Sequence, residues 1–138
     1  MKFFSRLSLT VFVLCFSFFS SLAFAANKTQ DVRFEKGATS AEYPAKITGY
    51  DFNDYVFYAK KGQALTAKLL TKSTKLWINL SNQHLESGVD LSEYSEALNK
   101  QGAYILPYSG KYTIRVGQYR AFARRDEHSD FTLLIEIK

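Results

Sequence analysis

The side chains that could do acid–base or nucleophilic chemistry are few and scattered in this sequence. Neither of its two histidines, His84 and His128, lies in a metal-binding His-Glu-x-x-His pattern or beside a Gly-x-Ser-x-Gly nucleophile elbow. Asp51 and Asp54 lie in a turn-like segment, which lacks the glycine and the distal glutamate of known calcium loops. We therefore predict that the chain is not an enzyme and holds no metal and no cofactor.

A second segment has the composition of a binding surface. Residues 118–125 (QYRAFARR) bring Arg120, Arg124 and Arg125 within six positions of one another, next to Tyr119. Arginine and tyrosine are enriched at binding hot spots, and a guanidinium group matches a carboxylate through two parallel hydrogen bonds. A solvated charged loop is the alternative interpretation. As a binding surface, the segment favours an acidic partner, either a cell-envelope polymer or the carboxylate-lined cleft of a glycosidase.

The segment Tyr108–Tyr112 (YSGKY) indicates a tight turn. Gly110 can adopt the positive φ that such a turn requires. Taken alone, this spacing predicts only a connection between two strands.

The elements that position these segments are short strands with alternating polarity. In residues 111–117, Tyr112, Ile114 and Val116 fall on one face and polar side chains on the other, which is the pattern of a half-buried antiparallel strand. Only Asp90–Lys100 (DLSEYSEALNK) favours a helix, of one or two turns. The sequence thus predicts an all-β fold, an antiparallel β-sandwich of about eight strands with one short helical turn. The expected strands are 31–35, 43–49, 54–59, 64–71, 75–81, 102–106, 111–117 and 130–138.

The first 25 residues have the organisation of a secretory signal peptide. Lys2 and Arg6 precede the apolar stretch Leu9–Phe19, and Ala23 and Ala25 supply the small residues that a signal peptidase requires. The stretch is shorter than the roughly 20 residues of a membrane span. We expect cleavage after residue 25, export to the periplasm and no membrane attachment afterwards. Removal of the two cations lowers the formal net charge from +5 to +3, which does not indicate a nucleic-acid binder.

What remains, residues 26–138, is predicted to form a single domain with one hydrophobic core. The only cysteine of the chain, Cys15, lies in the predicted signal peptide, so the exported domain has no disulfide and no thiol chemistry.

Five strings in this domain together resemble the periplasmic inhibitors of g-type (goose-type) lysozyme. The resemblance runs from about residue 32 to residue 138 in the same order and with nearly the same spacing. The strings are Gly49-Tyr50-Asp51; Tyr55-x-Phe57-Tyr58-Ala59-Lys60-Lys61-Gly62-Gln63; Val89-Asp90-Leu91-Ser92-x-Tyr94-Ser95; Leu106-Pro107-x-Ser109-Gly110-Lys111-Tyr112; and Arg115-Val116-x-Gln118-x-Arg120-x-x-Ala123-Arg124.

The resemblance implies a β-sandwich that blocks the active site of a g-type lysozyme, the expected protein partner. It implies that a Ser-Gly-x-Tyr loop enters the substrate cleft, which maps onto Ser109, Gly110 and Tyr112. It further implies that one tyrosine and two arginines contact the enzyme, and these correspond to Tyr50, Arg120 and Arg124. We expect the loop and the arginines to be neighbours on one surface.

Two questions stay open at this point. Tyr112 shares an apolar face with Ile114 and Val116, so it either contacts the enzyme or packs the loop from inside. An exported carbohydrate-binding module, with sugars stacked on exposed aromatic side chains, is the alternative function, and a minor hydrolase ranks below it. The sequence does not predict the oligomeric state.

Overall fold

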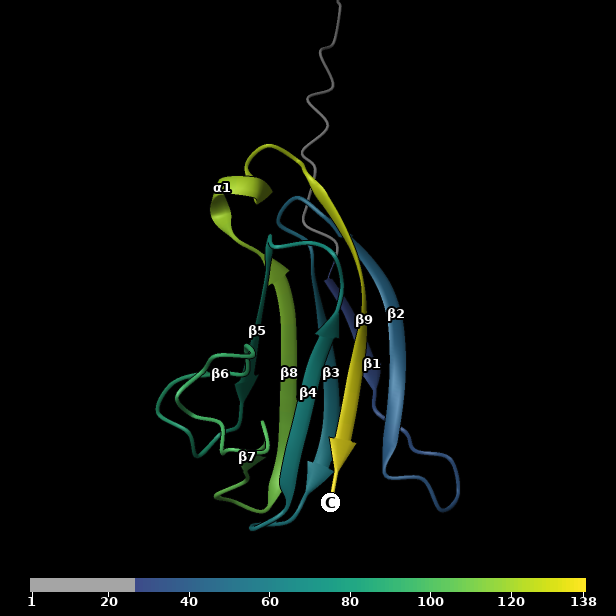
Figure 1. Ribbon diagram of the computed structural model, residues 1–138, viewed down its shortest axis with the longest axis vertical. Helices are drawn as coiled ribbons and strands as arrows, with labels where there is room; N and C mark the ends of the chain where they lie inside the picture. The colour runs from purple at the N-terminus through teal and green to yellow at the C-terminus, as the bar shows by residue number, and fades with distance from the viewer. Residues whose placement is uncertain (1–26) are drawn as a thin grey trace, which may run out of the picture.

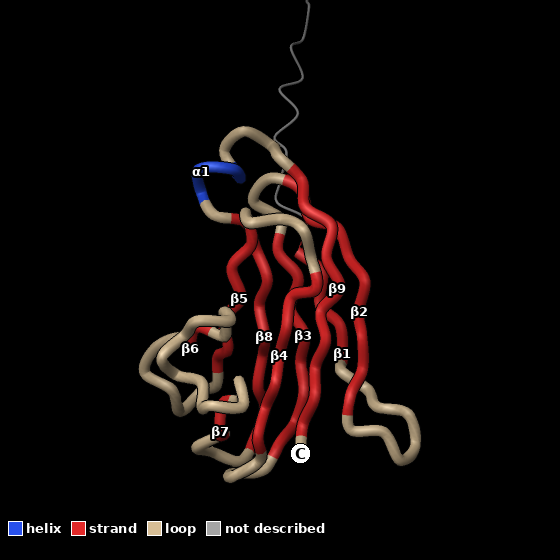
Figure 2. Tube along the Cα trace, viewed as in Figure 1, coloured by secondary structure: helices blue, strands red, loops and turns tan. Residues whose placement is uncertain are grey.

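Two β-sheets packed face to face make up residues 27–138, the part of the chain that the computed structural model describes (Figures 1 and 2). The signal peptide predicted for residues 1–25 lies outside the described residues. One sheet has the strand order β1 (Asn27–Asp31), β3 (Phe52–Ala59), β8 (Gly110–Gln118), β5 (Leu76–Ser81) and β6 (Val89–Asp90). The other has the order β2 (Ser40–Thr48), β9 (His128–Ile137), β4 (Ala64–Leu70) and β7 (Tyr104–Ile105). A helical turn, α1 (Arg120–Ala123), connects β8 to β9. The predicted all-β sandwich is confirmed.

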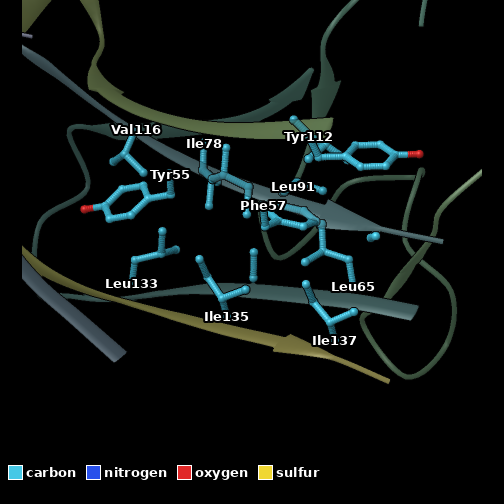
Figure 3. Packing of buried hydrophobic residues seen from close by; sticks show 14 of the residues in the cluster. Tyr55, Phe57, Leu65, Ile78, Leu91, Tyr112, Val116, Leu133, Ile135 and Ile137 are labelled. Carbon is cyan, nitrogen blue, oxygen red and sulfur yellow. The ribbon is translucent and has the colours of Figure 1, made fainter. Parts of the chain in front are cut away.

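The core lies between the sheets, where the alternating apolar positions of their strands meet. Tyr112 and Val116 of β8 face Leu133 and Ile135 of β9 across the interior, and all four are fully buried (Figure 3). Burial of a Leu, Ile or Val side chain contributes about 1.5–3 kcal/mol, so this shared interior fixes both the register and the facing direction of the strands.

The helix predicted for Asp90–Lys100 is wrong. Within that range β6 ends at Asp90 and irregular turns follow. The side chain of Asp90 accepts the backbone N–H of Ser92 at 2.9 Å, and the Ser95 hydroxyl accepts the backbone N–H of Ala97 at 3.2 Å. Such local bonds from Asp and Ser offer the backbone an alternative to the helical ladder.

The N-terminal strand also differs from its prediction. Strand β1 covers Asn27–Asp31 rather than residues 31–35, and it pairs with β3 in parallel, whereas the other strand pairs are antiparallel. All five residues of β1 are exposed, so no alternation marks the strand in the sequence. Strand β2 is an edge strand of its sheet, where Pro44, which has no backbone N–H to donate, is tolerated.

The direction of β8 determines where the connecting loops lie. Ala59 pairs with Gly110 and Phe52 with Gly117. The end of β3 therefore lies beside the start of β8, and the start of β3 lies beside the end of β8. The β2–β3 turn and α1 lie at one end of the sandwich, and the β3–β4 turn and the β7–β8 loop lie at the other (Figure 1). A nine-residue strand such as β8 is about 25–30 Å long, and this length separates the two ends. Within residues 27–138, the structure contains no helix with the length and apolar character of a membrane span.

Candidate functional site

One end of the sandwich carries exposed aromatic and cationic side chains, and we call it the arginine end. It consists of the β2–β3 turn (Gly49–Asp51) and residues 119–127, which include α1. Tyr50 is 55% exposed, and Arg120 and Arg124 are also exposed. The structure therefore brings together the three residues of the predicted enzyme-contacting set.

The arginines at this end differ in their partners. Arg125 forms an ion pair with Glu127, with its Nη2 2.8 Å from the carboxylate, and Lys75 Nζ lies 3.0 Å from the other carboxylate oxygen. The bond from Lys75, together with the charge of Arg125, holds the pKa of Glu127 below its ordinary value. Within the described part of the chain, Arg120 and Arg124 form no ion pair. Their charges are therefore uncompensated and available to an acidic partner.

Close backbone contacts hold the two segments of the arginine end together. Gly49 donates its N–H to the carbonyl oxygen of Glu127 at 2.9 Å and has a φ of +59°. A Cβ atom at Gly49 would lie 2.9 Å from Asp126 Oδ1, and the positive φ at this position favours glycine. Asp126 itself has a φ of +53°. Tyr50 is thus carried by a turn that lies directly against the segment following α1.

The Ser-Gly-x-Tyr segment forms a loop that internal hydrogen bonds hold in place, and Ser109 is exposed on it. The Ser109 hydroxyl accepts the backbone N–H of Lys61 at 2.8 Å, and Gly110 has a positive φ of 138°, as expected from the sequence. Tyr112 is fully buried. Its hydroxyl donates to the carbonyl oxygen of Tyr108 at 2.6 Å and accepts the N–H of the same residue at 3.2 Å. Tyr112 therefore holds the loop from inside, and its ring stacks on Phe57 with centroids 5.6 Å apart.

The expectation that the loop and the arginines are neighbours on one surface is wrong. Ser109 directly precedes β8, whereas Arg120 lies just beyond its last residue, so the length of the strand separates them (Figure 1). The structure groups Tyr50 with Arg120 and Arg124 at the arginine end and leaves Ser109, Gly110 and Tyr112 at the opposite end, which we call the serine end.

The acidic and histidine side chains considered for metal or acid–base chemistry are not grouped into a site. Asp54 accepts two hydrogen bonds from Arg115, at 2.7 and 2.8 Å, in a bidentate ion pair on the outer face of the five-stranded sheet. The ring of His84 lies against that of Tyr108, with centroids 5.3 Å apart. Residues 27–138 contain no group of three or more His, Cys, Asp or Glu side chains placed to hold a metal ion.

Sequence reasoning assigned no role to Gln118, a buried polar residue of the arginine end. Its amide bonds to both segments of that end. The alternation of β8 could have revealed its burial, because Gln118 continues the series of inward-facing positions Tyr112, Ile114 and Val116. A polar side chain at an inward position requires buried hydrogen-bond partners.

Similarity to a protein of known function identifies the family. The chain is 40% identical over 126 residues to the inhibitor of g-type lysozyme of Escherichia coli strain K12, with 91% of this chain and 93% of that protein aligned. The chain belongs to the family of g-type lysozyme inhibitors. No protein-family model matches its sequence. Membership of a family of inhibitor proteins agrees with the prediction that the chain is not an enzyme.

Solved structures of g-type lysozyme inhibitors have the same fold. A mutant of Escherichia coli PliG, a periplasmic lysozyme inhibitor of g-type lysozyme, is 38% identical and superposes with a TM-score of 0.77 over 83% of this chain and 100% of that one. PliG from Salmonella Typhimurium is also 38% identical, with a TM-score of 0.76 over 80% and 98% of the two chains. PliG from Aeromonas hydrophila is 33% identical, with a TM-score of 0.67 over 83% and 100%. All three are periplasmic inhibitors, which agrees with the predicted localisation.

Proposed function

We propose that this protein is exported as residues 26–138, a single domain, and inhibits g-type lysozymes in the periplasm, where it protects peptidoglycan from cleavage. The similarity to the Escherichia coli inhibitor over nearly its whole length carries this proposal. The partner is the enzyme itself, and no cofactor or metal takes part.

The arginine end is the surface that we place in the enzyme's cleft. A glycosidase needs carboxyl groups beside the scissile bond, so its cleft concentrates negative charge. Among residues 27–138, Arg120 and Arg124 form no ion pair, so they can meet these carboxylates directly. Tyr50 adds a large aromatic surface that loses little entropy on binding. Long-range attraction between the two charged surfaces also accelerates encounter.

Insertion of the Ser-Gly-x-Tyr loop is the second candidate, and the internal hydrogen bonds of the serine end favour it. The Ser109 hydroxyl already accepts a hydrogen bond from Lys61, so its own O–H group is left to donate to a cleft carboxylate. The buried hydroxyl of Tyr112 fixes the loop before binding, which reduces the entropy lost on association. Because the two ends lie a strand length apart, a single cleft can accommodate only one of them.

The test is a lysis assay with purified residues 26–138 and a g-type lysozyme. We expect lysis of cell walls to stop at a slight molar excess of inhibitor, and a peptidoglycan fragment that occupies the cleft to compete with the inhibitor for the enzyme. Full lysozyme activity at a large excess of inhibitor would refute the proposal. Retention on cell-wall polymer in the absence of enzyme would support the carbohydrate-binding alternative instead.

Two variants distinguish the two ends. Joint replacement of Arg120 and Arg124 by alanine removes the cations of the arginine end, whereas Ser109→Ala removes the hydroxyl of the serine end. Loss of inhibition in the arginine variant alone assigns the cleft to the arginine end, and loss in the Ser109 variant alone assigns it to the loop.

A further inference from the structure

The side chain of Gln118 makes three hydrogen bonds at the centre of the arginine end. Gln118 is 6% exposed and is the last residue of β8. Its Nε2 donates to the carbonyl oxygen of Gly49 at 3.2 Å and to that of Glu127 at 2.6 Å. Its Oε1 accepts the hydroxyl of Ser129 at 2.8 Å. Both amide hydrogens are therefore used, and each is bonded to a different segment.

The bonds of Gln118 continue into a wider polar network. Its backbone carbonyl accepts the indole N–H of Trp77 at 2.9 Å. The Ser129 hydroxyl lies 2.8 Å from that of Ser73, which in turn accepts the backbone N–H of Lys75 at 3.2 Å. Because its partners hold it in place on several sides, the amide of Gln118 is itself fixed in one orientation.

We propose that Gln118 is a positioning residue for inhibition. It holds the turn that carries Tyr50 against the segment that follows Arg124, and so presets the surface that meets the enzyme. The inference rests on the proposed function, and specifically on the use of the arginine end. Gln118 is buried, so it acts on the enzyme-facing surface indirectly, through its bonds to the backbone of Gly49 and Glu127.

The physical reason is the cost of leaving buried carbonyl groups unpaired. Without the amide of Gln118, the carbonyl oxygen of Gly49 loses its donor, and that of Glu127 keeps only the backbone N–H of Gly49 at 2.9 Å. Of these three hydrogen bonds only that one remains, and the Gly49 carbonyl can regain a donor only by moving towards water. The binding-competent arrangement then becomes one conformation among several. Apparent affinity falls in proportion to the competent fraction, so a surface that is competent one-tenth of the time binds about tenfold more weakly.

Two matched glutamine variants test this inference. Gln118→Met removes the amide at the arginine end while keeping a similar side-chain length. Gln63→Met makes the same chemical change at the other end, where Gln63 Oε1 accepts the N–H of Lys60 at 2.7 Å. Affinity for g-type lysozyme is measured by calorimetry well below both melting temperatures, and amide hydrogen exchange at Gly49 is measured in the free proteins.

For Gln118→Met we expect a dissociation constant raised about tenfold and faster exchange at Gly49, whereas Gln63→Met keeps the wild-type values. Gln118→Met binding at wild-type affinity, in an assay where the wild type inhibits, overturns the inference and leaves the proposed function intact. Equal losses in both variants overturn it too, because they indicate general destabilisation. A wild-type protein that does not bind refutes the proposed function instead.

A further variant keeps the test decisive should Gln118→Met fail to fold. Gln118→Glu keeps an oxygen for the Ser129 hydroxyl but turns the other oxygen towards two carbonyl groups. We expect a similar loss of affinity, and wild-type affinity in this variant would overturn the positioning role.

Discussion

Replacing Arg120 or Arg124 by alanine should weaken binding to g-type lysozyme without weakening the fold. Both side chains are exposed and neither has an ion pair within the described residues, so their removal breaks no ion pair there. We expect the free energy of unfolding to change by less than about 0.5 kcal/mol in each variant. If each arginine is a hot spot, binding loses about 2 kcal/mol, equivalent to a roughly 30-fold higher dissociation constant.

Arg125→Ala is the matched control for these two variants. Arg125 belongs to the same segment, but its guanidinium group is bonded to Glu127 at 2.8 Å. Its loss removes an exposed ion pair within the inhibitor, which contributes little, so the dissociation constant should rise far less than in the Arg120 and Arg124 variants.

Calorimetric titration at two salt concentrations provides the measurement. The wild-type affinity should fall as salt rises, and the Arg120→Ala and Arg124→Ala variants should show a weaker salt dependence. The reasoning would be refuted if Arg125→Ala weakened binding as much as Arg124→Ala, or if joint replacement of Arg120 and Arg124 left affinity unchanged.

Three further predictions concern residues that stabilise the sandwich near its two ends. Tyr112→Phe leaves the carbonyl oxygen of Tyr108 without its 2.6 Å donor and should lower the free energy of unfolding by about 1–2 kcal/mol in urea titration; an unchanged midpoint would contradict the role given to the hydroxyl. In Gly117→Ala the new Cβ would lie 2.4 Å from Trp77 Cζ2, so we expect about 1–3 kcal/mol of destabilisation and an altered fluorescence of this single tryptophan, and a wild-type spectrum would argue against the contact. The pKa of Glu127 is lowered from 4.5 by Lys75 and Arg125, so its contribution to stability is complete above that value and is lost as pH falls through the lower folded pKa. The melting temperature should therefore drop less on acidification in Glu127→Gln than in the wild type, and equal drops would show that other groups dominate.

The parts of the fold that the sequence revealed are those in which one face of a strand is buried. Strands β8 and β9 alternate because their inward side chains fill the core, and their limits agree with the predictions to within two residues. Strand β1 has no buried face, so alternation gave no sign of its true limits or its parallel pairing. The segment after Asp90 has helix-forming residues, but local side-chain bonds to the backbone prevail there.

The arrangement of the candidate site was predicted only in part. The resemblance selected Tyr50, Arg120 and Arg124, which the fold brings to one end, and their contact with the enzyme stays a prediction. It also placed Ser109 beside them, although the alternation of the intervening strand already implied a separation by its full length. The grouping of Tyr50 with the arginines depends on strand pairing between distant segments, which local patterns do not encode.

We propose that the arginine end, formed by the β2–β3 turn and residues 119–127, occupies the active-site cleft of a g-type lysozyme. Amide hydrogen exchange of this protein, measured alone and with excess lysozyme, tests it most directly. We predict new protection in residues 49–51 and 119–127 of the complex, with exchange in residues 106–111 unchanged. Protection confined to residues 106–111 would contradict the claim and assign the contact to the serine end.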